Sequence, residues 1–171
     1  MNITVIGEAN IDITVRPDRK DAVVSQMTCV PSHIAFHHGG VARNIAHNLC
    51  LLGHEVKLMT VFGDDDFAKS LIADCNHLGI DLSLSAQYPY EKSPIFLSFN
   101  DETGNMQSAA SDIALNDKMD VDWLKDKMET VNQSDLVVAD TLLSAEALSF
   151  LMDHCQAPLY IDTVSPGKAK R

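Results

Sequence analysis

Polar residues at the end of the first predicted strand, and a glycine pair further along the chain, are the groups most suited to binding chemistry. Asn10 and Asp12 come directly after the alternating run of residues 2–7, at the edge where ligands bind in open α/β sheets. Gly39 and Gly40 can adopt positive φ and let the backbone approach a ligand. These features indicate a binding edge, although an aspartate at this place could instead accept hydrogen bonds from the amides of a turn.

The segment after the glycine pair predicts a helix, a strand and a second helix. An apolar stripe recurs at helical spacing, so we expect it to be buried, with the polar residues between on other faces. The stripe is Val41, Ile45, Leu49 and Leu52, and the polar residues are Arg43 and His47. Gly53 is placed to end this helix. Residues 56–62 are typical of a strand covered on both faces. The aspartates of residues 64–66 favour the start of a helix over 66–78.

Short strands separate this segment from the last third of the chain. Residues 15–31 are polar and contain prolines, which predicts an exposed excursion, and residues 32–38 return as an alternating strand. Further strands are predicted over 81–86, 93–100 and 105–110, with the last two joined by a four-residue hairpin loop, 101–104. Antiparallel strands inside an otherwise alternating α/β chain predict a separate layer.

The last third of the chain alternates between helices and strands. A helix is predicted from Val121 to Val131 with Asp120 as its N-cap, and another begins at Ser144. Buried strands are predicted over 134–139 and 158–163, and this βαβα order favours a parallel sheet with right-handed crossovers. Asp140 and Asp162 follow those strands, so we expect them on the same rim as Asn10 and Asp12.

Composition excludes several classes of protein. The chain has 171 residues, 13 basic and 24 acidic, and a formal net charge of −11, which argues against nucleic acid as a partner. No apolar run reaches the roughly 20 residues of a membrane span, and the four cysteines form no C-x-x-C pair, so we expect a cytoplasmic protein with reduced thiols. The histidines at 33, 37 and 38 are explained by a polar strand face, and no metal site is expected.

The glycine segment resembles the first signature of the ribokinase-like, or PfkB, carbohydrate and nucleoside kinases. The pattern GG-x-x-x-N-x-A-x-x-L-x-x-L-G, followed by a strand and G-D-D, is matched by Gly39, Gly40, Asn44, Ala46, Leu49, Leu52, Gly53, Gly63, Asp64 and Asp65. The form GGVARNIAHNL is most similar to the pseudouridine kinase branch. Ala68 departs from the family's usual glycine after the acidic loop. The resemblance covers essentially the whole chain, but only the N-terminal part of the family's length.

This resemblance implies a ribokinase-like α/β fold, with a parallel sheet, flanking helices and a small antiparallel β-lid. Residues 1–171 would form the N-terminal, substrate-binding part, with lid strands around 12–38 and 90–111. In the family, the aspartate that Asp12 matches binds sugar hydroxyls, and a carboxylate can accept hydrogen bonds from two adjacent hydroxyls. The implied substrate-binding residues are Asn10, Asp12, Gly39, Gly40 and Asn44, with Asp140 and Lys168 as further rim candidates. The lid often dimerises the enzyme, so the resemblance also allows a homodimer.

ATP and Mg²⁺ are implied for a full-length member of the family. Its second signature, D-T-x-G-A-G-D, supplies the catalytic base and a helix N-terminus for the phosphates. The 171 residues contain no G-A-G-D, and the N-x-x-E element linked to magnesium is incomplete at 132–135, where we predict a helix end. We therefore expect no catalytic residue, and no strong binding of ATP or Mg²⁺, in this chain.

The final residues carry an expectation of their own. Ser165 and Pro166 are typical of a helix start, yet only five residues follow Pro166, and the last predicted strand is left without outer neighbours. We expect a chain truncated before the ATP-binding half.

The leading hypothesis is ATP-dependent phosphorylation of a sugar or nucleoside hydroxyl by the full-length parent, with this chain inactive alone. The alternative is a non-catalytic α/β binding or dimerisation module that self-associates through the lid strands. A dinucleotide-binding domain is disfavoured, because Gly7 is the only glycine near the first turn.

Overall fold

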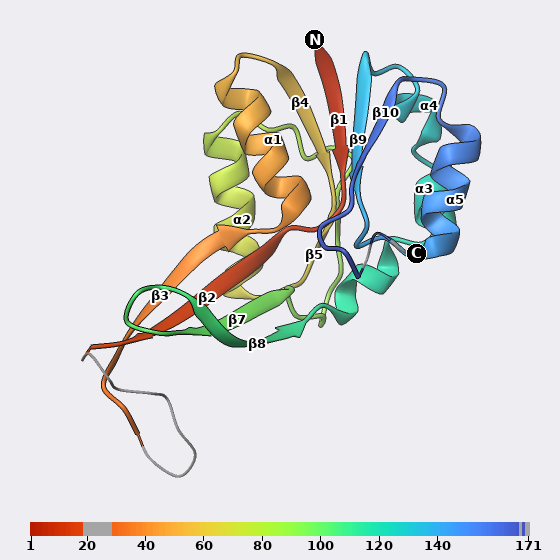
Figure 1. Ribbon diagram of the computed structural model, residues 1–171. Helices are drawn as coiled ribbons and strands as arrows, with labels where there is room; N and C mark the ends of the chain where they lie inside the picture. Colours follow the sequence, from red (N-terminus) through yellow and green to blue (C-terminus); the bar gives the residue numbers. More distant parts are fainter. Residues whose placement is uncertain (19–28, 168, 170–171) are drawn as a thin grey trace.

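A parallel sheet lies between two layers of helices, and a second sheet projects from one end of it (Figure 1). The computed structural model describes residues 1–18, 29–167 and 169. The main sheet consists of β1 (Asn2–Ile6), β4 (Glu55–Met59), β9 (Leu136–Asp140) and β10 (Leu159–Asp162). Its order is β10-β9-β1-β4, with every neighbouring pair parallel. The predicted parallel sheet is confirmed.

Strand β1 separates two apolar cores because its side chains alternate between the two faces of the sheet. Ile3 and Val5 pack in the core beneath α1 (Val41–Leu51) and α2 (Asp66–His77). Ile6 lies in the opposite core. That core is covered by α3 (Val121–Lys125), α4 (Met128–Val131) and α5 (Ala145–His154). A strand covered on both faces has side chains buried on both sides, and Ile3 to Ile6 of β1 are all buried.

The buried face of helix α1 coincides only in part with the predicted stripe, of which Ile45 and Leu49 do pack against the core. Ala42 and Ala46 are its fully buried apolar residues, whereas Leu52 lies beyond the helix and is 72% exposed. Alanine lets the helix axis approach the strands, and the larger side chains of the predicted stripe then pack at the margins of the contact. Arg43, predicted to lie on a face other than the buried stripe, is also buried. Gly53, with φ of 85°, does end the helix.

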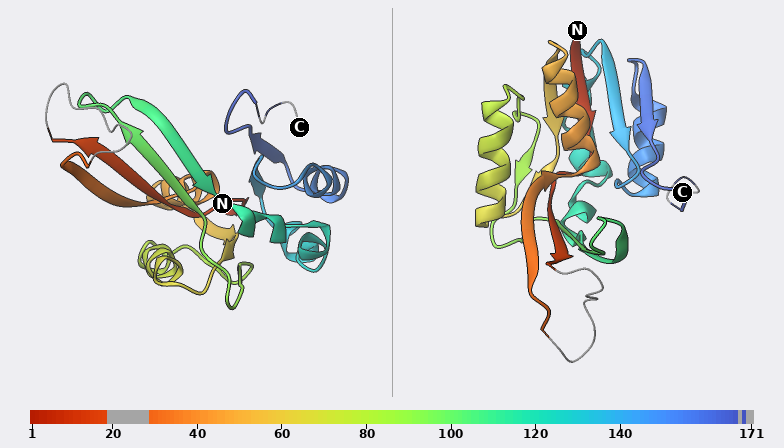
Figure 2. Two further views of the ribbon diagram at one scale, coloured as in Figure 1. Left: turned by 90° about the horizontal axis from the view of Figure 1, so that it is seen from below. Right: turned by 60° about the vertical axis from the view of Figure 1, so that its left-hand side comes forward.

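The projecting sheet, called the lid sheet below, joins strands from distant parts of the sequence (Figure 2). It contains β2 (Asn10–Pro17), β3 (Ser32–Gly39), β7 (Ile95–Asn100) and β8 (Met106–Asp112), in the order β3-β2-β7-β8. Its outer pairs are antiparallel, but β2 and β7 run parallel, so it is not the purely antiparallel layer predicted. Strand β2 also continues through Pro17, into the segment predicted as an excursion; residues 19–28 of that segment lie outside the described residues.

Several shorter elements differ from the sequence prediction. The strand predicted over 56–62 is interrupted at Thr60, whose amide donates to the Ser85 hydroxyl. Beyond it, β5 (Val61–Phe62) pairs with β6 (Ala86–Gln87). The strand predicted over 81–86 therefore pairs only at its two ends, through the bridge at Asp81 and through Ala86 of β6. The helix predicted over 121–131 is divided into α3 and α4. A 3-10 helix, η1 (Ala114–Lys118), precedes them and was not predicted.

None of the helices in the described part of the chain is long and apolar enough to cross a membrane.

Candidate functional site

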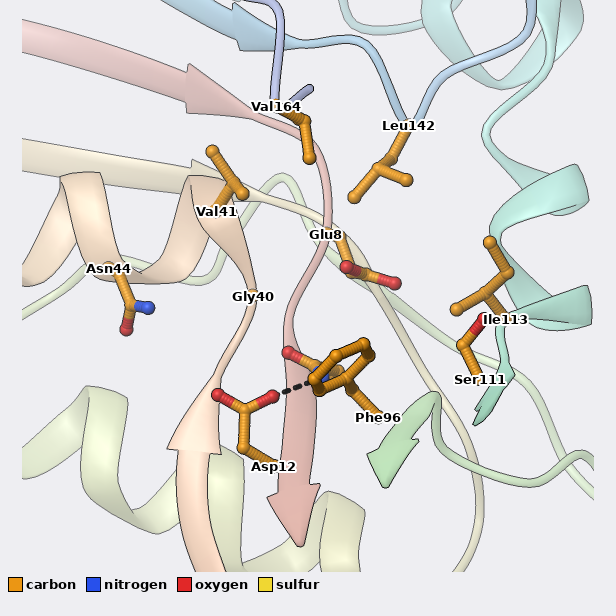
Figure 3. A pocket seen from close by; sticks show the side chains of 11 residues that line it. Glu8, Asp12, Gly40, Val41, Asn44, Phe96, Ser111, Ile113, Leu142 and Val164 are labelled. Atoms are coloured by element: carbon orange, nitrogen blue, oxygen red, sulfur yellow. Dashed lines mark hydrogen bonds between the residues drawn. The ribbon is translucent and has the colours of Figure 1, made fainter. Parts of the chain in front are cut away.

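A cavity of about 320 Å³ lies between the lid sheet, the β1–β2 connection and the start of α1 (Figure 3). Its polar lining is contributed by Glu8, Asn10, Asp12, Asn44 and Ser111. Its apolar lining comes from Val41, Phe96, Ile113, Leu142 and Val164, together with the backbone of Gly40. Segments from the whole length of the chain therefore meet at one place.

Asn10 and Asp12 stand two residues apart on β2, so their side chains emerge on the same face of the lid sheet. The Asn10 Nδ2 donates to Asp12 Oδ1 at 2.8 Å. Because a carboxylate can only accept, this contact fixes which end of the Asn10 amide faces Asp12. The other end, Oδ1, is buried and has no hydrogen-bond partner among the described residues, and Asn10 is only 3% exposed. An unsatisfied buried acceptor is costly, and a donor group on a bound ligand would satisfy it.

Both glycines of the pair are required by close contacts. A Cβ on Gly39 would collide with the Asp12 carboxylate, and a Cβ on Gly40 would collide with the Glu8 carbonyl. Gly40 also has φ of 95°, a conformation that glycine adopts far more readily than other residues. The glycine pair thus lets β3 turn into α1 directly beside Asp12, whereas the predicted approach of its backbone to a ligand stays a prediction.

Asp140 lies behind the cavity and does not line it. Its carboxylate is fully buried and accepts hydrogen bonds from the backbone amides of Glu8 (2.9 Å), Ala42 (3.2 Å) and Leu142 (2.9 Å). A Cβ on Gly7 would fall on this same carboxylate. The structure therefore gives Asp140 a positioning role that joins β1, α1 and β9, rather than a place on the exposed rim.

Asp162, which was also expected on this rim, does not line the cavity either. Asp162 Oδ1 accepts from the Val164 amide at 2.7 Å. This hydrogen bond orients Val164, which lines the cavity. Lys168 lies outside the described residues.

Glu8 and Ser111 are the polar residues lining the cavity that sequence analysis missed, and Glu8 is the charged one. It is buried, and the Asn116 Nδ2 donates to its Oε1 at 2.8 Å. One feature of the sequence could have indicated that Glu8 belongs to the site, since Glu8 lies between the first strand and Asn10. A charged residue is rarely buried unless it has a partner, and the partner stands on η1, an element that was not predicted.

The cavity is acidic, which determines what it can bind. Among the described residues, the charged side chains that line it are the carboxylates of Glu8 and Asp12. The nearby cation, Arg43, is paired with Asp74 on α2. Partial burial by itself would raise the pKa of Asp74, but the hydrogen bond and charge of Arg43 hold that pKa below its ordinary value. Such a lining favours neutral ligands rich in hydroxyl groups over phosphate anions.

Two of the three histidines of β3, His33 and His38, have side-chain partners within the protein. His33 Nε2 lies 3.2 Å from Asp18 Oδ1, and His38 contacts Asp74 and Ser70. No group of three or more metal-ligating side chains occurs within residues 1–18, 29–167 and 169. The incomplete N-x-x-E element at 132–135 is a helix end, as predicted, because Asn132 caps the C-terminus of α4. The Asn132 side chain donates to the His154 carbonyl and accepts from the Gln156 amide.

Comparison with known proteins shows where this architecture belongs. Residues 1–157 match the family model described as pfkB family carbohydrate kinase. The chain belongs to this family.

The family's relatives agree in sequence and in fold. A pseudouridine kinase from Escherichia coli (strain K12) is 32% identical over 167 residues, which are 97% of this chain and 52% of that protein. A solved structure of a putative sugar kinase from Clostridium perfringens superposes with a TM-score of 0.83 at 25% identity, covering 98% of this chain and 52% of that one. The structure of Arabidopsis thaliana ribokinase complexed with ribose and ATP has a TM-score of 0.76 at 18% identity, covering 94% and 52%.

These matches confirm the resemblance and the ribokinase-like α/β fold predicted from the glycine motif. The chain spans about half the length of the curated relatives it matches.

Proposed function

We propose that this chain supplies the sugar-binding side of a kinase that phosphorylates a hydroxyl of a ribose-like sugar or nucleoside, such as pseudouridine. One observation carries the proposal. Asn10, Asp12 and Asn44, from two elements separated in sequence, line one cavity beside a glycine pair. Membership of the carbohydrate kinase family and the similarity to a pseudouridine kinase support the choice of substrate.

The lining suggests how a sugar would be held. The Asp12 carboxylate can accept hydrogen bonds from two neighbouring hydroxyls, and charged acceptors form the stronger bonds. The unsatisfied Asn10 Oδ1 is a further acceptor in the same wall. Phe96, Ile113 and Leu142 form an apolar wall suited to a sugar's C–H groups or to a flat base. With Phe96 and Ser111 on β7 and β8, the lid sheet would shield a bound sugar from water, which phosphoryl transfer requires.

The cavity does not fit the phosphates of ATP. Its charged groups are carboxylates, which repel a triphosphate. The N-terminus of α1 would be the natural anion site, but its amides already donate to Asp140 and to the Glu8 carbonyl. The family implies ATP and Mg²⁺, and we propose that these groups require residues other than those lining this cavity. We also propose that the 171-residue chain does not turn over by itself.

Calorimetry tests the proposal directly. D-Ribose and pseudouridine titrated into the 171-residue chain should each give saturable heat, and Asp12→Asn should abolish most of it. The exposed and distant Asp122→Asn is the matched control and should bind like the unmodified chain. Absence of saturable heat from the unmodified chain with both ligands would reject the proposed site. ATP consumption by this chain with either ligand would reject its proposed inactivity.

Self-association through the lid sheet is a second candidate function, favoured by a separate observation. Ile34 and Phe36 on the edge strand β3 are 59% and 60% exposed. They pair with Val15 and Ile13 of β2, so they extend the apolar face of the sheet. Light scattering should give the mass of a dimer for the chain and of a monomer for Phe36→Asp. A monomeric unmodified chain would exclude this role.

A further inference from the structure

Arg43 is a buried charged residue next to Asn44, which lines the cavity. It is the third residue of α1 and only 5% exposed. Its Nη1 donates to Asn44 Oδ1 at 3.0 Å, and its Nη2 forms an ion pair with Asp74 on α2. Burying a guanidinium is expensive unless it is paired, so a role in packing alone would be served better by an apolar residue.

The guanidinium is anchored from two other elements. Asp74 holds Nη2 through one carboxylate oxygen, and its second oxygen lies 3.3 Å from His38 Nδ1. His38 is the residue of β3 immediately before the glycine pair, and its Nε2 contacts Ser70 Oγ at 2.8 Å. Helix α2 and the base of the lid sheet therefore fix the Arg43 side chain before any ligand is bound.

This anchoring determines the orientation of the Asn44 amide. Arginine has five N–H donors and no acceptor, so the Asn44 atom that faces it must be the carbonyl oxygen. The amide nitrogen, a donor, then lies on the other side of the group. Figure 3 shows the Asn44 nitrogen turned toward the side of Gly40, with the oxygen turned away.

We propose that Arg43 is a positioning residue that makes Asn44 present a hydrogen-bond donor to the cavity. This inference rests on the proposed function, because it specifies which hydrogen-bond donors and acceptors the proposed sugar site offers to its ligand. The cavity then has complementary polarity, with acceptors at Asp12 and Asn10 and a donor at Asn44. A ligand hydroxyl at Asn44 must accept, and hydroxyls at Asp12 must donate, so the site selects a hydroxyl over a protonated amine at the position beside Asn44.

Substitution of Asn44 by aspartate tests whether the side-chain amide presents its nitrogen or its oxygen to the cavity. In Asn44→Asp, one carboxylate oxygen can still accept from Arg43, and the other replaces the donor that faces the cavity. Asn44 is exposed on α1, so the fold should tolerate the change. We expect D-ribose and pseudouridine to bind Asn44→Asp at least as weakly as Asn44→Ala, about tenfold below the unmodified chain.

Asn48→Asp is the matched control, because Asn48 lies one turn further along α1, is exposed and does not line the cavity. It should leave calorimetric affinity unchanged. Affinity of Asn44→Asp within about twofold of the unmodified chain would show that Asn44 presents its oxygen to the ligand, and would overturn the inference.

A second measurement needs no ligand. The side-chain ¹⁵N amide signal of Asn44, identified by its loss in Asn44→Ala, should have a heteronuclear NOE close to that of the α1 backbone. Arg43→Lys keeps a charge opposite Asp74 but loses the planar fork, and should lower this NOE to that of exposed side chains. An unchanged NOE would overturn the inference. If no sugar binds the unmodified chain, the proposed function fails while this NMR result still decides the role of Arg43.

Discussion

The main sheet and the lid sheet each contain four strands but are stabilised in different ways. The main sheet is covered by helices on both faces, and Val5, Leu58 and Val137 in its strands are completely buried. The lid sheet is covered only in part, and every residue of β8 is exposed. The main sheet therefore provides a rigid platform. The lid sheet contributes binding groups from strands that have few buried apolar contacts of their own. The residues that line the cavity lie where the two sheets meet.

Among the proposed variants, replacement of Asp140 in the platform should lower the free energy of unfolding most. In Asp140→Ala, three buried backbone amides lose their acceptor, since the carboxylate bonds the amides of Glu8, Ala42 and Leu142. At about 1–3 kcal/mol for each unsatisfied group, we expect a loss of about 4 kcal/mol in the free energy of unfolding, measured by urea denaturation. Asp135→Ala removes an exposed acceptor of a single amide, that of Asn2, and should cost less than about 1 kcal/mol. Similar losses for the two variants would contradict this account of Asp140.

Equivalent truncations in the two sheets should differ sharply. Leu58→Ala, in β4, would leave a cavity in a fully buried core and should lower the free energy of unfolding by about 3 kcal/mol. Met106→Ala, in β8, removes a side chain that is largely exposed and should change it by less than about 0.5 kcal/mol. Chemical denaturation of both variants measures the difference. Comparable costs would mean that the lid sheet is as closely packed as the main sheet.

Loss of the Asp12 charge should affect binding rather than folding. Asp12→Asn keeps an acceptor for Asn10 but removes the carboxylate that would hold two hydroxyls. We expect a 10- to 100-fold weaker affinity for ribose, since hydrogen bonds to charged groups contribute about 1.5–3 kcal/mol. The thermal midpoint should stay within about 2 °C, measured by differential scanning fluorimetry. A large fall in the midpoint would assign Asp12 a structural role like that of Asp140.

The sequence predicted the platform better than the region where the sheets meet. The helical and strand periodicities around Val5, Ala139 and Ser144 predicted the elements of the parallel sheet, because a buried strand and a capped helix have local signals. The order of its strands was not predicted. The glycine motif gave the family and the fold. Asn10, Asp12, Gly40 and Asn44 do lie together at one cavity, whereas their roles in binding stay predictions.

Most of the differences between prediction and structure share a physical cause. Asp140 and Asp162 end β9 and β10, as predicted, but their carboxylates accept hydrogen bonds from backbone amides and neither lines the cavity. Arg43 was placed away from the buried face of its helix, and Glu8 was given no role. Asp140, Arg43 and Glu8 each have a partner distant in sequence, such as Asp74 for Arg43 and Asn116 for Glu8, whereas Asp162 bonds the nearby Val164 amide. A single sequence contains no local signal for such pairings.

The smallest expected effect concerns the acidic loop that joins the platform to the lid. Asp65 caps α2 at Ala68 and also accepts from the amide and hydroxyl of Ser93, just before β7. Partial burial opposes ionisation of Asp65, but the hydrogen bonds from Ser93 and Ala68 outweigh it and lower the pKa below the ordinary value of 3.8.

A lowered pKa means that the folded protein binds fewer protons than the unfolded chain just below pH 3.8, so stability rises with pH in that window. The contribution is fully present above the ordinary pKa and is lost as the pH falls through the lowered one. Asp65→Asn can still cap α2 but does not titrate, so its urea-denaturation free energy should fall less steeply on acidification. Ser93→Ala, which removes one of the lowering hydrogen bonds, should give an intermediate slope. Identical slopes for the three proteins would show that the link between loop and lid does not depend on this charge.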